Sequence, residues 1–427
     1  MKAMFTFEPA AFQKALGQFS NIINNKMALP ILQDIMVGYD NDRDMVWLMG
    51  SDTESWLKMD CIHPVTVDDE TTMQPWAQIH EDDSKDRFTA VCIPFRRLKD
   101  AISAVPRGGY MLRVWFETSG EQIQMRVDYG IGEFTFPCDA ALEFPPMAKV
   151  VTMEGVQSGE QGMSAATPVC SFTVRGPQLM PYIKQARICC ANDELRPVMN
   201  TECLDVWLDR MVLVASDGHT LYRRQFDMGA GWLGYHSFPV DGSAKLMVPK
   251  AVLPTICDIF ADADQVNVTA DTQRIEWRRE GVVLVSRLME GNYPNYESVI
   301  PKKNEKIVTM NVGALAGAIK RVGLFASESS GMITMVRQGS ELRIDAADYD
   351  FSRSGNERVS IQNAGDTTLP EGESYGFKMS TIAGLLGCVA TENLHLLLGD
   401  PSHAALIKEE DVKSTLTLLA MPMLVNE

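Results

Sequence analysis

The residues whose types and spacing could do chemistry lie at positions 216–220, which read Ser-Asp-Gly-His-Thr. Asp217 could orient His219 as a general base, or the two side chains could hold a metal ion together. The sequence gives this pair few partners, because the other five histidines are scattered and no His-Glu-x-x-His motif occurs. A tight turn explains the same residues, since an aspartate accepts backbone N–H groups and Gly218 supplies a positive φ. We predict the turn, and keep a metal-dependent hydrolase centred on Asp217 and His219 as the alternative function.

The nine cysteines suggest no second chemical site. An odd number without any Cys-x-x-Cys spacing fits neither a disulfide framework nor a zinc site. The N-terminal segment has no long apolar stretch of the secretory type, and no run of about 18 apolar residues could span a membrane. We therefore expect a cytoplasmic protein with reduced thiols, no metal, no cofactor and no catalytic residues.

The elements that position these residues recur three times along the 427 residues. Each repeat has an amphipathic helix, a strand that ends in an aspartate-bearing turn, and a second helix. The predicted helices are 9–25, 94–107, 177–190, 249–260, 311–325 and 379–392, and the turns lie at 51–52, 216–217 and 345–348. This order predicts an α+β fold with three repeated domains, 1–150, 168–301 and 305–427, each with two helices packed on antiparallel sheets. An acidic insertion (68–86) and a linker (154–167) interrupt the pattern.

The charges are divided unevenly between the predicted helices and the rest of the chain. The six helical ranges hold ten basic and three acidic residues, a net charge of +7. Since the whole chain carries −17, the remainder carries −24. Solvated helix faces would produce this division, and so would helices that line a surface facing phosphates.

Several motifs in a fixed order resemble one protein family. They are Leu-Pro-Ile-Leu at 29–32, the segment 196–200 ahead of Val-Ala-Ser-Asp-Gly-His, the segment 291–301, and Met-Pro-Met at 421–423. Together they resemble the bacterial DNA polymerase III β subunit, the β sliding clamp, over essentially the whole chain. The resemblance implies a DNA polymerase processivity factor and not an enzyme. It also implies a ring that is a head-to-tail homodimer of six DNA-clamp domains around duplex DNA, bound without regard to sequence.

The resemblance also implies where partners bind. The replicative DNA polymerase, the clamp loader and repair proteins would insert short linear motifs into a peptide cleft. Carried over by position, that cleft comprises Met199, Ser216, Gly218, His219, Thr220, Leu221, Pro294, Val299, Leu419, Met421, Pro422 and Met423. The chain departs from the family at the cleft rim, where Thr220 and Ser298 replace basic residues, and at the C-terminus, where residues 424–427 follow Met423.

Two further sets of residues are expected to contact DNA and the second subunit. Lys26 and Arg196 match the family directly, and the other DNA-facing residues are chosen because they are basic and lie on predicted helices. That group is Arg96, Arg97, Lys99, Lys184, Arg187, Lys250, Lys320 and Arg321. At the dimer interface, Phe134 and Phe136 of one subunit should meet Leu324 and Phe325 of the other, because burying such side chains stabilises an interface.

Overall fold

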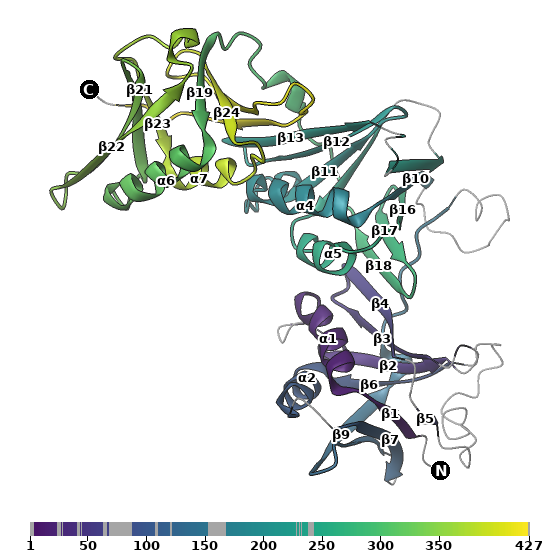
Figure 1. The fold of residues 1–427 in the computed structure, drawn as a ribbon. Helices are drawn as coiled ribbons and strands as arrows, with labels where there is room; N and C mark the ends of the chain where they lie inside the picture. The colour runs from purple at the N-terminus through teal and green to yellow at the C-terminus, as the bar shows by residue number, and fades with distance from the viewer. Residues whose placement is uncertain are drawn as a thin grey trace. The chain divides into compact units, whose positions relative to one another are not determined.

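The computed structural model describes residues 4–23, 27, 29–40, 43, 45–62, 66–67, 88–106, 110–119, 122–152, 168–227, 229, 231, 233–237 and 243–425 (Figure 1). Lys26, the acidic insertion and the linker lie outside these residues. The chain forms two compact units, one of Met1–Pro177 with Pro254–Arg287 and the other of Gln178–Leu253 with Leu288–Glu427. The three predicted domain boundaries remain predictions.

All six predicted helices are present in the described residues, each shorter than its predicted range. They are α1 (Pro9–Gln18), α2 (Phe95–Ala104), α4 (Gly176–Ala186), α5 (Leu253–Phe260), α6 (Val312–Val322) and α7 (Met379–Leu386). Single 3₁₀ turns are η1 (Phe19–Asn21), η2 (Pro30–Gln33), η3 (Ala141–Glu143), η4 (Arg187–Cys189), η5 (Pro197–Asn200), η6 (Tyr296–Ser298), η7 (Gly323–Phe325) and η8 (Ala364–Asp366). Helix α5 begins four residues later than predicted because Pro249 still belongs to a strand, in which it pairs with Thr201. The described residues contain no helix that is long and apolar enough to cross a membrane.

The first unit is built on one antiparallel sheet. Its strands are β1 (Met4–Phe7), β2 (Asp34–Asp40), β3 (Met45–Ser51), β4 (Ser55–Ile62), β5 (Thr66–Val67), β6 (Phe88–Pro94), β7 (Leu112–Ser119), β8 (Gln122–Asp128), β9 (Glu133–Ala140), β10 (Pro168–Val174), β16 (Val266–Asp271), β17 (Arg274–Arg279) and β18 (Val282–Arg287). The spatial order is β10-β16-β17-β18-β4-β3-β2-β6-β9-β8-β7-β1-β5. Helix α1 packs against α2 and β4, and α2 packs against β2 and β6, so the two helices together cover this part of the sheet (Figure 1).

Gly38 on β2 allows a close approach inside this unit. A Cβ atom built at Gly38 would lie 2.2 Å from the Trp47 indole of the neighbouring strand β3. The Lys58 ammonium lies 4.5 Å from the centroid of the same indole ring, a favourable cation–π contact. The packing of the ring therefore requires glycine at position 38.

The second unit has its own antiparallel sheet. Its strands are β11 (Thr201–Val206), β12 (Arg210–Ser216), β13 (Thr220–Asp227), β15 (Ala244–Pro249), β19 (Lys306–Asn311), β20 (Met332–Gln338), β21 (Glu341–Asp348), β22 (Arg353–Gln362), β23 (Ser374–Lys378), β24 (Asn393–Leu398), β25 (Ala405–Glu409) and β26 (Thr417–Ala420). Strand β14 (Leu233–Ser237) lies between β13 and β15 in sequence but is not part of this sheet. The order β15-β11-β12-β13-β26-β25-β24-β19-β22-β21-β20-β23 joins strands far apart in sequence. Helix α6 packs against α7 and β22. Both units thus confirm the predicted α+β class with antiparallel sheets.

The aspartate-bearing turns recur as predicted. The Oδ1 atom of Asp52 accepts hydrogen bonds from two backbone N–H groups at 3.0 and 2.6 Å, between β3 and β4. Asp217 does the same at 2.9 and 2.6 Å between β12 and β13. Asp348 accepts at 3.2 and 3.4 Å between β21 and β22. The same pair of bonds also occurs at Asp271 between β16 and β17, at 2.7 and 2.7 Å, so this aspartate turn is not confined to the three predicted positions.

Candidate functional site

The turn at 216–220 fixes its polar side chains through its own backbone. Besides the N–H groups of His219 and Thr220, the Asp217 Oδ1 atom accepts the Thr220 hydroxyl at 2.9 Å. The Ser216 hydroxyl donates to the Thr220 carbonyl at 2.7 Å and accepts the Gly218 N–H at 3.2 Å. Gly218 has φ +89°, the left-handed conformation expected of it. The Asp217 carboxylate therefore holds the turn together, as the sequence predicts.

This arrangement gives the hydrolase alternative no support. An aspartate that orients a catalytic histidine bonds the imidazole, whereas in the described residues the donors to Asp217 are two backbone N–H groups and a hydroxyl of its own turn. In the described part of the chain, no three His, Cys, Asp or Glu side chains group closely enough to hold a metal ion. Burial raises the pKa of the Cys138, Cys170 and Cys189 thiols to about 12, so they are protonated and weakly nucleophilic at neutral pH.

Two motif spacings escaped the sequence analysis, and neither lies in the context that its chemistry needs. Gly372-Glu-Ser-Tyr-Gly376 has the Gly-x-Ser-x-Gly spacing of a nucleophile elbow. Ser374, however, begins strand β23 and pairs with Val336, whereas an elbow serine sits on the turn from a strand into a helix. Gly229, Gly231 and Gly234 have the Gly-x-Gly-x-x-Gly spacing of a dinucleotide loop, but this segment joins strands β13 and β14 and opens no helix.

Pairing of β13 with β26 brings the predicted cleft residues together. Thr220 is the Cα partner of Ala420 in this ladder, and Leu221 is the partner of Leu419. The ladder ends where the Met421 N–H donates to the His219 carbonyl at 2.8 Å. The C-terminal Met-Pro-Met segment therefore adjoins the turn at 216–220, although about 200 residues separate the two in sequence.

A buried apolar cluster supports this junction from below. Leu221, Leu419, Tyr293 and Tyr296 belong to it, together with side chains from β11, β12, β15 and β25. The Tyr296 hydroxyl donates to Asp205 Oδ2 at 2.7 Å, and burial raises the pKa of the phenol, so this hydroxyl remains a donor. The cluster and this hydrogen bond hold η6, and with it Pro294 and Val299, against the sheet.

The predicted cleft residues divide into a floor and a rim. Those that are buried form the floor: Met199, Thr220, Leu221 and Leu419. Those that are exposed form the rim: Gly218, His219, Pro294, Val299 and Met421. Ser216, Pro422 and Met423 are half-buried. The rim offers apolar groups to a ligand, whereas Leu221 and Leu419 are core residues whose truncation would destabilise the fold itself.

The tail beyond the Met-Pro-Met segment is anchored at its start. The Met423 N–H donates to the Gly376 carbonyl of β23 at 2.8 Å. A Cβ atom at Gly376 would lie 2.7 Å from the Met423 carbonyl oxygen, so glycine permits this approach. Leu424 follows with an exposed side chain.

The residues predicted to face DNA differ in whether their side chains already have an ion-pair or hydrogen-bond partner within the protein. Arg97, Lys184, Arg187 and Lys320 are exposed, and no carboxylate of the described residues forms an ion pair with them. Four others have partners at short range. Arg96 approaches Asp100 at 3.8 Å, Lys99 donates to Ser20 at 2.8 Å, Arg196 pairs with Asp193 at 2.8 Å, and Arg321 pairs with Glu357 at 2.6 Å.

Lys250 has a structural task that its basic side chain did not reveal. Its ammonium donates to the carbonyls of Cys190 and Ala191 at 2.9 and 3.4 Å and to the Asn192 side chain at 3.1 Å. These are acceptors just beyond η4, so Lys250 fixes the segment that follows this turn. A contact with DNA would compete with these bonds.

The four residues predicted for the dimer interface also differ in exposure to solvent. Phe134 on β9 is half-buried and stacks on Tyr129 with ring centroids 4.9 Å apart, whereas Phe136 is buried within its own unit. Leu324 and Phe325 of η7 are exposed. Phe325 lies against Gly355 of β22, where a Cβ atom would be 2.6 Å from its ring.

Comparison with known proteins gives the same family as the motifs. The family models for the DNA polymerase III beta subunit match in two parts, the central domain at residues 173–295 and the C-terminal domain at 297–424. Beta sliding clamps of Pseudomonas aeruginosa and Escherichia coli K12 are each 22% identical, over 98% of this chain and 99% of the relative.

Solved structures have the same fold. A sliding clamp from Pseudomonas aeruginosa bound to griselimycin has a TM-score of 0.80 at 20% identity, covering 100% of both chains. The DNA polymerase sliding clamp from Bacillus subtilis has a TM-score of 0.78 at 17% identity, again over 100% of both chains. Since the two family models match more than half of the residues, the chain belongs to the DNA polymerase III beta subunit family, the sliding clamps.

Proposed function

We propose that this protein is a cytoplasmic, non-enzymatic processivity factor. Two copies would form a head-to-tail ring around double-stranded DNA and tether the replicative DNA polymerase, the clamp loader and repair proteins through short linear motifs. The observation that carries this proposal is the junction of β13 and β26, where exposed apolar groups surround a buried apolar floor. An extended segment with apolar anchors suits such a surface.

The two methionines at 421 and 423 suit several partners. Exposed Met421 and half-buried Met423 have flexible thioether side chains, which repack around anchors of different shape. Val299, just after η6, is exposed as well. Burying a large apolar anchor stabilises a complex by about 1.5–3 kcal/mol.

The charge distribution supports DNA passage through a ring. Arg97 on α2, Lys184 on α4 and Lys320 on α6 present exposed charges on helices of a chain with net charge −17. Few, exposed cations give weak contacts with phosphates that carry no sequence information, which permits sliding. Acidic residues elsewhere keep DNA from other surfaces.

Exposed apolar residues support the proposal of a contact with a second subunit. Leu324 and Phe325 are exposed, and so are Tyr349 and Phe351 in the turn between β21 and β22. Phe134 of the partner copy would pack on such a surface, because large exposed apolar patches are typical of interfaces. Phe136 would lie beneath the contact.

The decisive experiment measures peptide binding and ring retention. We expect the double variant Val299→Asp with Met421→Asp to bind a polymerase-derived peptide about tenfold more weakly, or weaker still. Val412→Asp is the matched control, since Val412 is an exposed valine at the turn between β25 and β26. Loaded protein should stay on nicked circular DNA and leave when the circle is cut.

Either of two results would contradict the proposal. One is a peptide affinity that the double variant leaves unchanged. The other is a protein that sediments as a stable monomer at micromolar concentration.

A further inference from the structure

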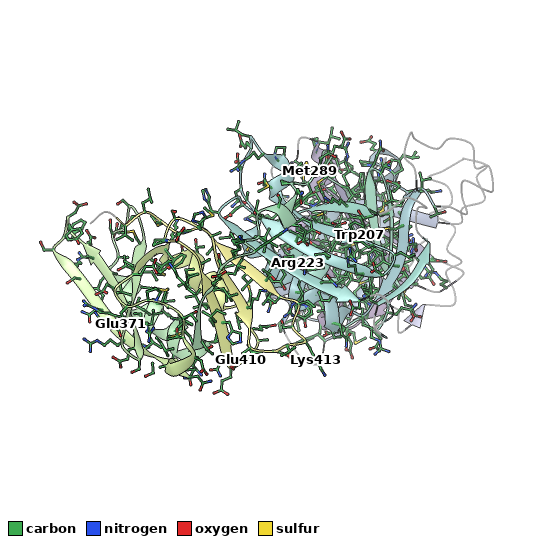
Figure 2. All side chains as sticks on the ribbon, turned by 90° about the horizontal axis from the view of Figure 1, so that it is seen from above. Trp207, Arg223, Met289, Glu371, Glu410 and Lys413 are labelled. Carbon is green, nitrogen blue, oxygen red and sulfur yellow. The ribbon has the colours of Figure 1, made fainter. Side chains whose placement is uncertain are left out.

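An ion pair adjoins the cleft, formed by two residues outside the predicted site. Arg223 of β13 places Nε and Nη2 each 3.1 Å from the Glu297 Oε1 atom of η6. Its Nη2 atom also donates to Gln225 at 3.2 Å. The Arg223 side chain is 18% exposed and the Glu297 side chain 55%. The cation is thus mostly covered, and the carboxylate faces solvent (Figure 2 labels Arg223 on its strand).

The location of this pair follows from strand alternation. Arg223 stands two residues after Leu221 on β13, so both side chains lie on the same face of the sheet. Thr417 is the Cα partner of Arg223, two residues before Leu419. Glu297 lies between Pro294 and Val299, the two rim residues of η6 and its flanks. The pair therefore stands at the end of the row formed by Leu221 and Leu419.

The carboxylate has capacity for another partner. In the described residues, the hydrogen bonds to Glu297 all end on Oε1, and a carboxylate offers roughly four acceptor sites in total. Arg223 fixes the position of the group, so a second cation would bind a carboxylate that is already ordered.

Three segments that carry or adjoin the rim residues are acidic in sum. The segments 193–196, 216–223 and 289–299 contain the basic residues Arg196 and Arg223 and five acidic ones, a net charge of −3. The acidic residues are Asp193, Glu194, Asp217, Glu290 and Glu297. An acidic ligand would meet this field and would reach Arg223 only by displacing Glu297.

We infer that Glu297 is a specificity-determining residue of the cleft, which selects partner segments carrying a lysine or arginine beside their apolar anchors. Arg223 is its positioning residue. The inference rests on the proposed peptide-binding function, and names the chemical class of ligand that this cleft prefers. It agrees with the expectation from the family resemblance that Thr220 and Ser298 stand in place of basic side chains, because a cation at either place would repel such a ligand.

The test compares synthetic peptides with the same leucine and phenylalanine anchors, with lysine or glutamate at each flanking position in turn. Fluorescence anisotropy measures each affinity at low and high salt. We expect the best lysine peptide to bind about two- to fivefold tighter than its glutamate counterpart, the range of an exposed ion pair. The preference should shrink at 1 M salt, where screening acts within about 3 Å.

Three variants test whether Glu297 causes the preference for lysine peptides. Glu297→Lys should reverse the preference, and Arg223→Gln should reduce it while the salt-independent part of the affinity stays the same. Glu371→Lys is the matched control, an equal change of charge at an exposed glutamate that Figure 2 shows well away from Arg223. It should leave the preference intact.

The outcomes separate the inference from the proposed function. Equal binding of lysine and glutamate peptides at low salt, unaffected by Glu297→Lys, overturns the inference and leaves the peptide cleft standing. Failure of every peptide to bind overturns the cleft and the inference with it. Loss of the preference in Glu371→Lys as well would assign it to net charge and overturn the role of Glu297.

Discussion

Removing one partner of the buried pair Arg224–Glu409 should destabilise the strand that carries the cleft. The Arg224 Nη2 atom lies 2.6 Å from Glu409 Oε2, and the two side chains are 9% and 4% exposed. Arg224 belongs to β13 and Glu409 to β25, the two neighbours of β26. The pair therefore spans the strand that ends at the Met-Pro-Met segment.

The magnitude follows from burial. Two charges about 4 Å apart attract by about 4 kcal/mol at an effective dielectric constant of about 20, which roughly balances the cost of taking them out of water. Arg224→Met leaves the Glu409 carboxylate buried without its cation, and should cost about 3–5 kcal/mol. The Tyr182 ring, 4.3 Å from the guanidinium, would lose a cation–π contact as well.

The double variant makes the prediction specific. Glu409 Oε1 accepts the Ala390 N–H at 2.8 Å, and glutamine keeps that acceptor. Arg224→Met with Glu409→Gln should therefore recover about 2 kcal/mol or more of the loss, since no unpaired charge remains. Urea unfolding with hydrogen exchange of β13, β25 and β26 measures the free energy of unfolding locally.

If the stability losses of Arg224→Met and of Glu409→Gln simply add up in the double variant, the two charges do not interact. That result would refute this reasoning. A loss below about 1 kcal/mol in Arg224→Met would mean that water reaches the pair. If the reasoning holds, Arg224→Met should also weaken peptide binding, whereas the double variant should largely restore it.

Three further predictions follow from backbone, packing and titration. Gly218→Ala should destabilise the second unit by about 1 kcal/mol because of its positive φ, +89°. Thr53→Gly, at the matching position of the first turn with φ +74°, should be stabilising by a similar amount, and thermal unfolding that moves both variants in one direction would contradict this. Gly38→Ala should cost about 1–3 kcal/mol by displacing the neighbouring indole, measured by urea unfolding against Gly365→Ala, where no atom lies within 4 Å. Burial, the charge of Asp139 and a hydrogen bond to it raise the pKa of Asp34 to about 7. The stability that the protonated Asp34 contributes is full below about pH 4 and is lost as the pH rises through 7, so Asp34→Asn should flatten the pH dependence of unfolding between about pH 4 and 7.

Local features of the fold could be predicted from the sequence, and long-range pairing could not. Helical periodicity located all six helices, and the residue types at 216–220 predicted the turn and the positive φ of Gly218. Nothing local indicates that Leu221 pairs with Leu419, because strand partners so distant are chosen by packing. The family resemblance grouped the cleft residues, but only burial separates floor from rim. Lys250 shows the same limit, since a basic residue near a helix can serve the backbone instead of a ligand.

In the described residues, two junctions make the same backbone hydrogen bond, and their side chains differ in how well they suit the proposed peptide. In the first unit, the Arg287 N–H donates to the Glu54 carbonyl at 2.8 Å, as the Met421 N–H does to the His219 carbonyl. The same backbone hydrogen bond therefore ends the strand pairing in both places. Glu54 and Arg287 form an exposed ion pair at 3.3 Å, however, where the other junction exposes an imidazole and a thioether. Covering the exposed ion pair with an apolar anchor would cost desolvation free energy. Covering the Met421 side chain is favourable, because it removes apolar surface from water. Peptide binding should therefore saturate at one site per chain, and Glu54→His with Arg287→Met should create a weak second site. Two sites per unaltered chain would show that the backbone, and not these side chains, sets the specificity.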